Sequence, residues 1–470
     1  MWRRSYHTVK ALYQLGPQQE VDVKGWIQSI RLLKKIAFID LRDGTSSKTL
    51  KVAIPIRDSS PLDLLKSIKT GQSISISSAQ WLPTPHREQP FELKVVDPLK
   101  RIQVLGDVTP QYPLQKKSHT LQFLRTLPHL KHRSNYMGSL LRFRSHVELA
   151  LANFFQQQHF TKVTPPLLTS SDCEGAGELF KVDSTAASAQ LYFGRQTYLT
   201  VSTQLHLEAL ALALSKCWTL TPCFRAEKSD TNRHLSEFWM LEAEWCFPKD
   251  VHELTHVAEN MVKAVVKSCL GQKDELIPPI IPEECESAEI VVQRWQNLLG
   301  SRCWPTITYT EAIEILATQH KKQAFPKYEP KWGSALQSEH EKWLAGEYFK
   351  SPVFVTDYPR DCKAFYMKQN DDEAGKETVA CFDLLVPGMG EVAGGSMRED
   401  NLDKLVQEMD RRQMNRRGDL DWYVALRKEG SAPHGGYGLG VERLISYLYG
   451  NHNIRDAIPF HRSATGTIEL

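Results

Sequence analysis

The sequence lacks the features of a membrane-spanning protein and of a disulfide-stabilised one. No apolar run among its 470 residues approaches the roughly 20 residues that a membrane-spanning helix needs. The nine cysteines are odd in number and contain no CxxC pair, which argues against a disulfide framework and against a zinc knuckle. With 41% hydrophobic and 24% charged residues, the chain has a globular composition and the length of two or three domains, and a reducing compartment is the default.

Acidic residues are absent from two stretches of an otherwise balanced chain, whose 58 basic and 55 acidic residues give a net charge of only +3. Between Val108 and Val147 there is no Asp or Glu, whereas several Lys and Arg residues fall there. Such a basic block suits contact with phosphates, and a solvated linker is the alternative. Residues 1–19 also lack acid and carry basic residues, which predicts a short organellar targeting segment, with an ordinary basic N-terminus as the alternative.

The chain divides into three regions by pattern. Residues 20–105 contain five short alternating or β-branched segments separated by Gly, Ser and Pro, namely VDVKGWI, AFIDLRD, LKVAI, SISISS and FELKVV. Five such strands fit a closed barrel of the OB type, which commonly binds single-stranded nucleic acid. Residues 106–138 are expected to form a basic hinge. Residues 139–470 alternate helices and strands in a larger domain, with an insertion near 270–335 and no internal repeat.

One stretch, CFRAEKSDTNRHLSEFWMLEAEW at 223–245, crowds charged and aromatic residues together in register. Arg225 and Glu227 alternate with apolar neighbours, and further on so do Phe238 and Glu242. Alternation with period two predicts two strands of a hairpin, with the polar middle as its loop. One face of the hairpin then carries an Arg, a Glu, an aromatic ring and a second Glu, which indicates a binding site. A solvated charged loop is the alternative.

A second polar cluster lies in CFDLLVPGMGEVAGGSMRE, where Asp383 sits in an apolar strand and Glu391 follows a Gly-rich turn. Two carboxylates beside such a bend are suited to hold a Mg²⁺ ion that bridges phosphates. Glycines there allow the backbone to approach a ligand closely. The structural alternative is that Asp383 caps a turn or forms an ion pair.

A third cluster lies in APHGGYGLGVERLISYLYG. Its helical apolar stripe, which ends at Gly450, is formed by Val441, Leu444, Ile445 and Leu448. Arg443 lies off this stripe in the first turn, where a cation opposes the helix dipole unless an anion binds there. No GxxxxGKS/T loop and no GxGxxG spacing is present, so any phosphate is bound by arginines. Positioned arginines with Mg²⁺ predict a reaction at the α-phosphate of ATP.

The motifs FRAE with RHLSEF, GLGVER, and a helix leading to VTPPL resemble motifs two, three and one of the class II aminoacyl-tRNA synthetases. CEGAGELF, YLTVSTQLHLE and LVPGMGEVAGGS look like segments of the asparaginyl enzymes, within the aspartate, asparagine and lysine subgroup. The likeness covers nearly the whole chain from about residue 21. It implies an α+β fold, in which an OB-type anticodon-binding barrel precedes a catalytic domain built on an antiparallel sheet flanked by helices. It also implies ATP and Mg²⁺ as cofactors, L-asparagine and tRNA(Asn) as partners, and a homodimer.

The resemblance further implies a role for each matching residue. The ATP site, with Arg225 and Arg443 as catalytic residues, would consist of Arg225, Glu227, His234, Phe238, Glu391 and Arg443. The metal ligands would be Asp383 and Glu391. The amino acid would be held by Glu174, Ser202, Gln204, Glu242 and Arg398. The anticodon contacts would be Arg31 and Phe38, and the alternative for Phe38 is a core aromatic of the barrel.

Glu242 is the residue expected to select asparagine over aspartate. The amide of asparagine offers an acceptor oxygen and a donor NH₂, so Arg398 can bind the oxygen while a carboxylate accepts from the NH₂. Aspartate meets a like charge there, which can cost about 10⁴-fold in favourable cases. Aspartyl enzymes carry a Lys where Leu207 stands, and the family usually has a Gln where Lys51 stands. The alternative for Glu242 is pairing with a neighbouring base.

Other activities compete with asparagine–tRNA ligation. An aspartyl or non-discriminating synthetase is disfavoured by Glu242 and Leu207. An inactive RNA-binding paralogue is disfavoured because Arg225, Arg443 and Asp383 are all present. An ammonia-dependent asparagine synthetase would need neither the barrel nor the basic hinge. The basic first residues favour the mitochondrial matrix over the cytoplasm.

Overall fold

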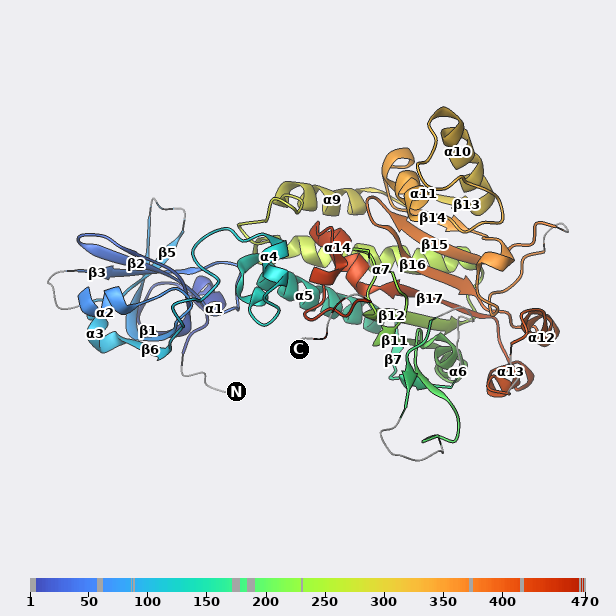
Figure 1. Ribbon diagram of the computed structural model, residues 1–470, viewed down its shortest axis with the longest axis horizontal. Helices are drawn as coiled ribbons and strands as arrows, with labels where there is room; N and C mark the ends of the chain where they lie inside the picture. The colour runs from blue at the N-terminus through green and yellow to red at the C-terminus, as the bar shows by residue number, and fades with distance from the viewer. Residues whose placement is uncertain are drawn as a thin grey trace. The chain divides into compact units, whose positions relative to one another are not determined.

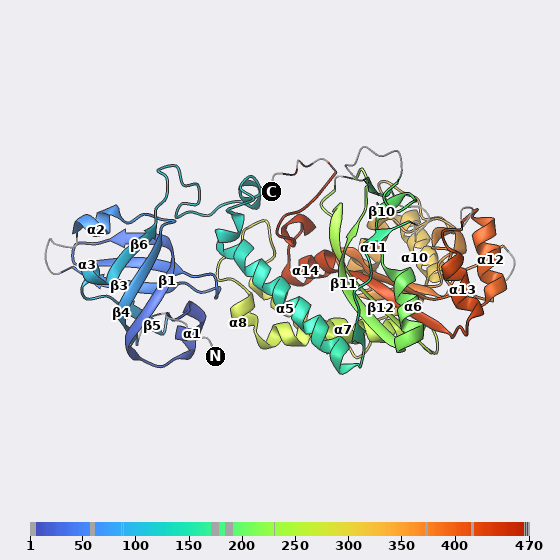
Figure 2. The same cartoon turned by 90° about the horizontal axis from the view of Figure 1, so that it is seen from below.

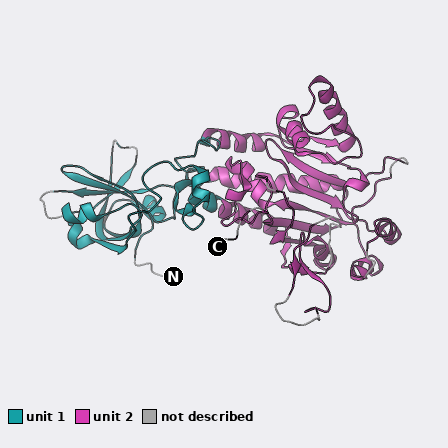
Figure 3. Cartoon of the chain, viewed as in Figure 1, with its two compact units in different colours: residues 1–143, 272–288, 470 teal, residues 144–271, 289–469 magenta. Residues whose placement is uncertain are grey.

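The computed structural model describes residues 6–56, 62–85, 87, 89–170, 178–183, 191–229, 231–371, 375–414, 418–464, 466 and 468. The chain forms two compact units (Figure 3). The first consists of Met1–Phe143, Gln272–Ala288 and Leu470, and the second of Arg144–Gly271 and Glu289–Glu469. In the described residues, no helix is both long enough and apolar enough to cross a membrane.

The first unit contains a β-barrel. Its strands are β1 (Gln18–Leu32), β2 (Ile36–Arg42), β3 (Leu50–Pro55), β4 (Ser73–Pro83), β5 (Phe91–Lys94) and β6 (Ile102–Gly106). The strand order is β1-β2-β3-β5-β4-β6, and pairing of β1 with β4 closes the barrel (Figure 2). The five expected strand segments lie in β1 to β5, so this part of the fold prediction is confirmed. The unit's short helices are α1 (Val9–Gln14), α2 (Leu62–Ser67), α3 (Pro98–Arg101), α4 (Leu121–Arg125), η1 (Lys131–Arg133) and α8 (Lys273–Leu276).

Alternation along the strands builds the core of the barrel. In β2, Ala37, Ile39 and Leu41 are fully buried, while the residues between them are only partly so. The helix α1 contributes to the same core, because its Val9 and Leu12 are 1% and 0% exposed and belong to the barrel's apolar cluster. Part of the stretch expected as a targeting segment, the helix α1, is therefore folded against the barrel.

The second unit is organised around an eight-stranded sheet of order β13-β14-β15-β16-β17-β12-β11-β7 (Figure 1). Every pairing from β14 to β11 is antiparallel, and the two outermost pairings are parallel. The strands of this unit are β7 (Thr161–Lys162), β8 (Leu168–Thr169), β9 (Lys181–Val182), β10 (Thr197–Leu199), β11 (Lys216–Phe224), β12 (Glu237–Cys246), β13 (Thr306–Thr308), β14 (Val353–Thr356), β15 (Cys381–Val386), β16 (Gly390–Met397) and β17 (His434–Gly440).

Helices pack against this sheet, which confirms the expected α+β class. The long helix α5 begins at Asn135 in the first unit and ends at Gln157, and its Phe155 stacks on Trp218 of β11 at 4.9 Å between ring centres. Figure 1 shows α7 running behind the strands. The remaining helices are α6 (Gln204–Leu214), α7 (Val251–Gly271), α9 (Ala288–Gly300), α10 (Tyr309–Lys322), α11 (Ser338–Trp343), η2 (Leu344–Tyr348), η3 (Arg360–Cys362), α12 (Leu402–Arg411), α13 (Asp421–Lys428), α14 (Val441–Tyr449) and η4 (Ile454–Asp456).

Two local predictions, for a helix near the C-terminus and for a proline-containing segment, can be compared with the structure. The helix predicted from the apolar stripe near the C-terminus is confirmed as α14, with Gly450 left-handed at φ 72° after its last residue. The segment FTKVTPPLL reads in the sequence as a strand that two prolines interrupt, and the structure divides it into β7 and the start of β8, which lie in different sheets. Pro165 and Pro166 stand between them, and proline lacks the N–H that a continuous ladder requires.

Candidate active site

A cavity of about 190 Å³ opens on the sheet of the second unit. It gathers seven of the residues expected in the active site, namely Ser202, Gln204, Arg225, Glu242, Asp383, Glu391 and Arg398. They come from segments as far apart in sequence as the start of α6 and the end of β16. Glu174 lies outside the described residues.

The hairpin expected from alternation is present as β11 and β12, but its first strand is shorter than predicted. β11 ends at Phe224, so the prediction that Arg225 and Glu227 continue the strand is wrong. Arg225 still donates its backbone N–H to Ser236 of the opposite arm, at 3.0 Å. The next N–H, of Ala226, turns away to the carbonyl of Glu178 at 2.8 Å, which ends the ladder.

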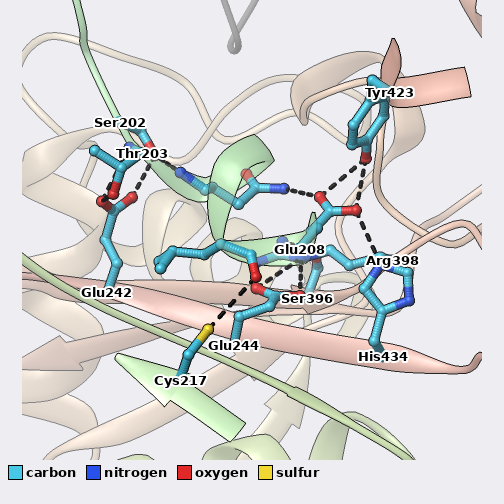
Figure 4. Close-up of polar contacts among 12 residues, drawn as sticks. Ser202, Thr203, Glu208, Cys217, Glu242, Glu244, Ser396, Arg398, Tyr423 and His434 are labelled. Carbon is cyan, nitrogen blue, oxygen red and sulfur yellow. Dashed lines mark hydrogen bonds and ion pairs between the residues drawn. The ribbon is translucent and has the colours of Figure 1, made fainter. Parts of the chain in front are cut away.

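Glu242 lines the cavity and is 4% exposed. Its carboxylate accepts from the hydroxyls of Ser202 and Thr203, and from the backbone N–H of Thr203 at 3.0 Å (Figure 4). No ion pair joins Glu242 to a basic side chain of the residues that the structure describes. The geometry therefore does not support the alternative that Glu242 pairs with a neighbouring base.

Arg398 lines the same cavity as Glu242 and is bound by a second buried carboxylate. Its Nε and Nη2 atoms donate to Glu244 at 3.0 and 2.8 Å, and its Nη1 atom donates to the hydroxyl of Ser396 at 2.7 Å (Figure 4). Burial opposes the charge of Arg398, but Glu244 outweighs this effect and raises the pKa of the guanidinium. For Glu244, burial is the larger effect and raises the pKa of the carboxyl, although the charge of Arg398 acts to lower it. Sequence reasoning did not assign Glu244, although it lies two residues from Glu242 on the same strand face.

The two carboxylates expected to hold a metal converge over one glycine. A side-chain carbon added to Gly394 would lie 3.1 Å from Oδ1 of Asp383 and 3.3 Å from Oε1 of Glu391. Lys363, which the sequence did not single out, donates to both oxygens of Asp383 at 2.7 and 2.6 Å. An ammonium therefore lies at Asp383, and the oxygens of Asp383 and Glu391 that face Gly394 are hard ligands of the kind that Mg²⁺ prefers.

The pKa values of these two carboxylates are shifted in opposite directions. Burial raises the pKa of Asp383, with Lys363 acting against it. Burial also disfavours the charged form of Glu391, but Arg443 and Lys363 outweigh it and lower the pKa. Nη1 of Arg443 donates to the backbone carbonyl of Glu391 at 3.1 Å, and the same atom lies 3.5 Å from the carboxylate of Glu391. Each carboxylate thus has a cation beside it, Lys363 at Asp383 and Arg443 at Glu391, and cations positioned in this way can neutralise phosphate charge.

The other residues expected to bind ATP gather around Arg225. Its guanidinium carbon lies 5.6 Å from the ring centre of Phe238, and its Nη1 atom lies 3.7 Å from the carboxylate of Glu227. His234 lies 3.9 Å from the same carboxylate. Burial lowers the pKa of His234. The carboxylate of Glu227 acts to raise this pKa, whereas the charge of Arg443 lowers it further.

A further anchor for this region comes from α11, which follows the segment 270–335 expected to be an insertion. Arg233 donates to the hydroxyl of Ser338 and lies 3.5 Å from the carboxylate of Glu341. Glu341 also accepts from the backbone N–H of Glu391 at 3.2 Å. One helix outside every recognised motif therefore ties the hairpin loop to the strand that carries Glu391.

The two residues expected at the anticodon lie in the first unit. Arg31 on β1 and Phe38 on β2 are directly paired across the sheet. Phe38 is half-buried on the face opposite the fully buried Ala37 and Ile39, so it is not part of the barrel core. Lys51, which stands where the family usually has Gln, forms an ion pair with Asp40.

Comparison with known proteins agrees with this arrangement. The profile of the tRNA synthetases class II (D, K and N) matches residues 121–464. The chain belongs to this family. The family members similar to it include a mitochondrial asparagine–tRNA ligase of Saccharomyces cerevisiae, 58% identical over 98% of this chain and 96% of that protein. An asparagine–tRNA ligase of Microcystis aeruginosa is 43% identical over 97% and 98% of the two chains.

Solved structures of family members agree with the fold. The crystal structure of asparaginyl-tRNA synthetase from Pyrococcus horikoshii complexed with asparaginyl-adenylate superposes with a TM-score of 0.84 and 29% identity, over 98% of this chain and 99% of that one. The resemblance to the asparaginyl class II synthetases, and the barrel-plus-antiparallel-sheet architecture that it implied, are thereby confirmed.

Proposed function

We propose that this chain is an asparagine–tRNA ligase, which activates L-asparagine with ATP and transfers the asparaginyl group to the 3′ end of tRNA(Asn). The observation that carries the proposal is the lining of the cavity, in which Glu242 and Arg398 are both buried, so that a carboxylate and a guanidinium are available to one ligand. The full-length likeness to asparagine–tRNA ligases supports it.

The hydrogen-bonding capacity that Glu242 and Arg398 have left suits a carboxamide ligand. Glu242 has about four lone-pair sites, and three of them are used by Ser202 and Thr203, which leaves one for the NH₂ of asparagine. Arg398 has five N–H donors, and its bonds to Glu244 and Ser396 leave donors for the amide oxygen. Because Glu244 already neutralises Arg398, the carboxylate of aspartate would meet the uncompensated charge of Glu242.

The reaction needs no covalent enzyme intermediate. A carboxylate oxygen of asparagine attacks the α-phosphorus of ATP, the bond to the bridging oxygen breaks, and pyrophosphate leaves. A ribose hydroxyl at the tRNA 3′ end then attacks the activated carbonyl carbon, and AMP leaves. Arg225 at the α-phosphate and Arg443 with His234 at the outer phosphates supply positioning and charge neutralisation. Ser202, Gln204 and Glu174 would hold the backbone groups of asparagine, while Glu227 and Phe238 would hold adenine.

Asp383 and Glu391 would hold Mg²⁺, which supplies further neutralisation of phosphate charge when bound. Lys363 keeps the Asp383 carboxylate in place beside that position.

The barrel of the first unit, residues 20–105, would bind the anticodon through Arg31 and Phe38, with the basic segment 106–138 as a hinge. The outward face of Phe38 supports a stacking role, because every base offers a π-face to an aromatic ring. Two relatives named as mitochondrial support action in the mitochondrial matrix, and the resemblance supports a homodimer.

Asparagine-dependent ATP–pyrophosphate exchange tests the proposal, with aspartate measured in parallel. The wild type should exchange with asparagine alone. Glu242→Gln should lose discrimination by about tenfold or more, because its amide can donate to the carboxylate of aspartate. Glu314→Gln, on the exposed face of α10, serves as the control and should behave as the wild type.

Two results would contradict this reading. Equal exchange with both amino acids in the wild type would indicate a non-discriminating or aspartyl enzyme. Absence of exchange with either, in a folded chain that still binds tRNA, would indicate an inactive RNA-binding paralogue.

A further inference from the structure

A third buried carboxylate, Glu208, lies next to the cavity without lining it. It is 0% exposed and lies on α6, four residues after Gln204, so the two side chains share one face of that helix. Gln204 does line the cavity, among the residues proposed to hold the backbone groups of asparagine.

Four side chains donate to Glu208. Its Oε1 atom accepts from Nε2 of Gln204 at 2.6 Å and from the hydroxyl of Tyr423 at 2.9 Å. Its Oε2 atom accepts from Nη2 of Arg427 at 2.7 Å and from Nε2 of His434 at 2.9 Å. Figure 4 shows Glu208 between Tyr423 and His434, which come from α13 and β17. Three separate elements thus converge on one carboxylate.

The neighbours of Glu208 keep it ionised. Both ring nitrogens of His434 face acceptors, because Nδ1 lies 2.7 Å from the carbonyl oxygen of Ala432 and Nε2 faces Glu208. Both nitrogens therefore donate, and the ring is an imidazolium. Burial opposes the charge of Glu208, but Arg427 and His434 outweigh it and lower its pKa.

An ionised carboxylate fixes which way the amide of Gln204 points. A glutamine amide can present either its oxygen or its NH₂ to a partner, but an ionised carboxylate only accepts hydrogen bonds. Gln204 must therefore turn its NH₂ toward Glu208, and its oxygen lies on the opposite edge of the planar amide. A ligand in the cavity then meets an acceptor. The α-ammonium group of an amino acid offers three donors and no acceptor, and so requires this orientation.

We propose that Glu208 is a positioning residue for amino-acid binding, which holds the Gln204 amide with its oxygen available to the α-ammonium of asparagine. This inference rests on the proposed function for the ligand. Its chemistry does not depend on the side chain of the amino acid, so Glu208 contributes to affinity and not to the choice between asparagine and aspartate.

A reciprocal exchange of the two side chains tests the inference. In Glu208→Gln, the new amide can turn its oxygen to Arg427 and its NH₂ to Gln204, which then turns its own NH₂ into the cavity. The KM for asparagine in ATP–pyrophosphate exchange should rise about tenfold to a hundredfold, since one charge-assisted hydrogen bond is lost. The KM for ATP should stay within about twofold. The double variant Gln204→Glu/Glu208→Gln restores an acceptor in the cavity, and should recover most of the loss.

Glu259→Gln is the matched control, because it also neutralises a buried, ion-paired carboxylate of the second unit that is not part of the cavity lining. It should lower the melting temperature without changing the KM for asparagine.

If Glu208→Gln does not fold, Glu208→Asp keeps the charge that Arg427 and His434 need but shortens the reach to Gln204. It should still raise the KM for asparagine several-fold.

Three results would overturn the inference: an unchanged KM for asparagine in the folded Glu208 variant, an equal rise in both KM values, or failure of the double variant to recover. Absence of asparagine-dependent exchange in the wild type would instead refute the proposed function, so the two failures are distinguishable.

Discussion

At the scale of single residues, the site is a set of carboxylates that each face a matched donor. Glu242 faces hydroxyls and an N–H, Glu244 faces a guanidinium, and Asp383 faces an ammonium. Sequence reasoning found the residues that stand in recognisable motifs or in a strand register, such as Glu242 and Asp383. It missed Lys363, because nothing in its local sequence indicates that the chain folds back onto β15.

Lys363→Met tests whether this ammonium stands in for a metal cation when none is bound. Breaking a buried ion pair should cost about 3 kcal/mol of unfolding free energy, since Asp383 is left without its counter-charge. Mg²⁺ would replace the missing charge, so addition of MgCl₂ should raise the melting temperature of the variant more than that of the wild type. Lys267→Met, at an exposed position on α7, is the control. Equal Mg²⁺ shifts in all three proteins would show that Lys363 and the metal do not share a position.

At the scale of elements, regular patterns were predictable and irregular ones were not. The barrel strands followed from period-two alternation, and α14 followed from its apolar stripe and Gly450. The end of β11 at Phe224 did not, because it depends on a backbone bond from Ala226 to the distant Glu178. The anchoring helix α11 likewise has no local signal for its contact with Arg233.

The helix α1 limits how much of the N-terminal segment can be removed without damage. Thr8 caps it, and Val9 and Leu12 are buried in the barrel, where two such side chains contribute about 3–5 kcal/mol. Deletion of residues 1–14 should therefore lower the melting temperature of the full-length protein, whereas deletion of residues 1–5 should not. Mass spectrometry of the protein purified from mitochondria should place its N-terminus before Thr8. A mature N-terminus after Leu15 would contradict a structural role for α1.

At the scale of the whole molecule, the tasks proposed for the two units are separable. The cavity with its proposed ATP and asparagine contacts belongs to the second unit, and the proposed anticodon contacts belong to the first. ATP–pyrophosphate exchange uses asparagine and ATP alone, whereas aminoacylation also requires tRNA. The domain boundaries expected from sequence, at 105 and 138, stay predictions that this separation of activities can test.

Phe38→Ala distinguishes the two tasks within one chain. Loss of one stacked base costs about 1–3 kcal/mol, so the KM for tRNA in aminoacylation should rise about fivefold to a hundredfold. Pyrophosphate exchange should stay at the wild-type rate, because Phe38 lies on β2 of the barrel and contributes nothing to the cavity. Leu99→Ala, an exposed apolar residue of α3 in the same unit, is the control and should alter neither reaction. A fall in both activities would mean that Phe38 acts through stability of the chain, and an unchanged KM for tRNA would place the anticodon on another face of the barrel.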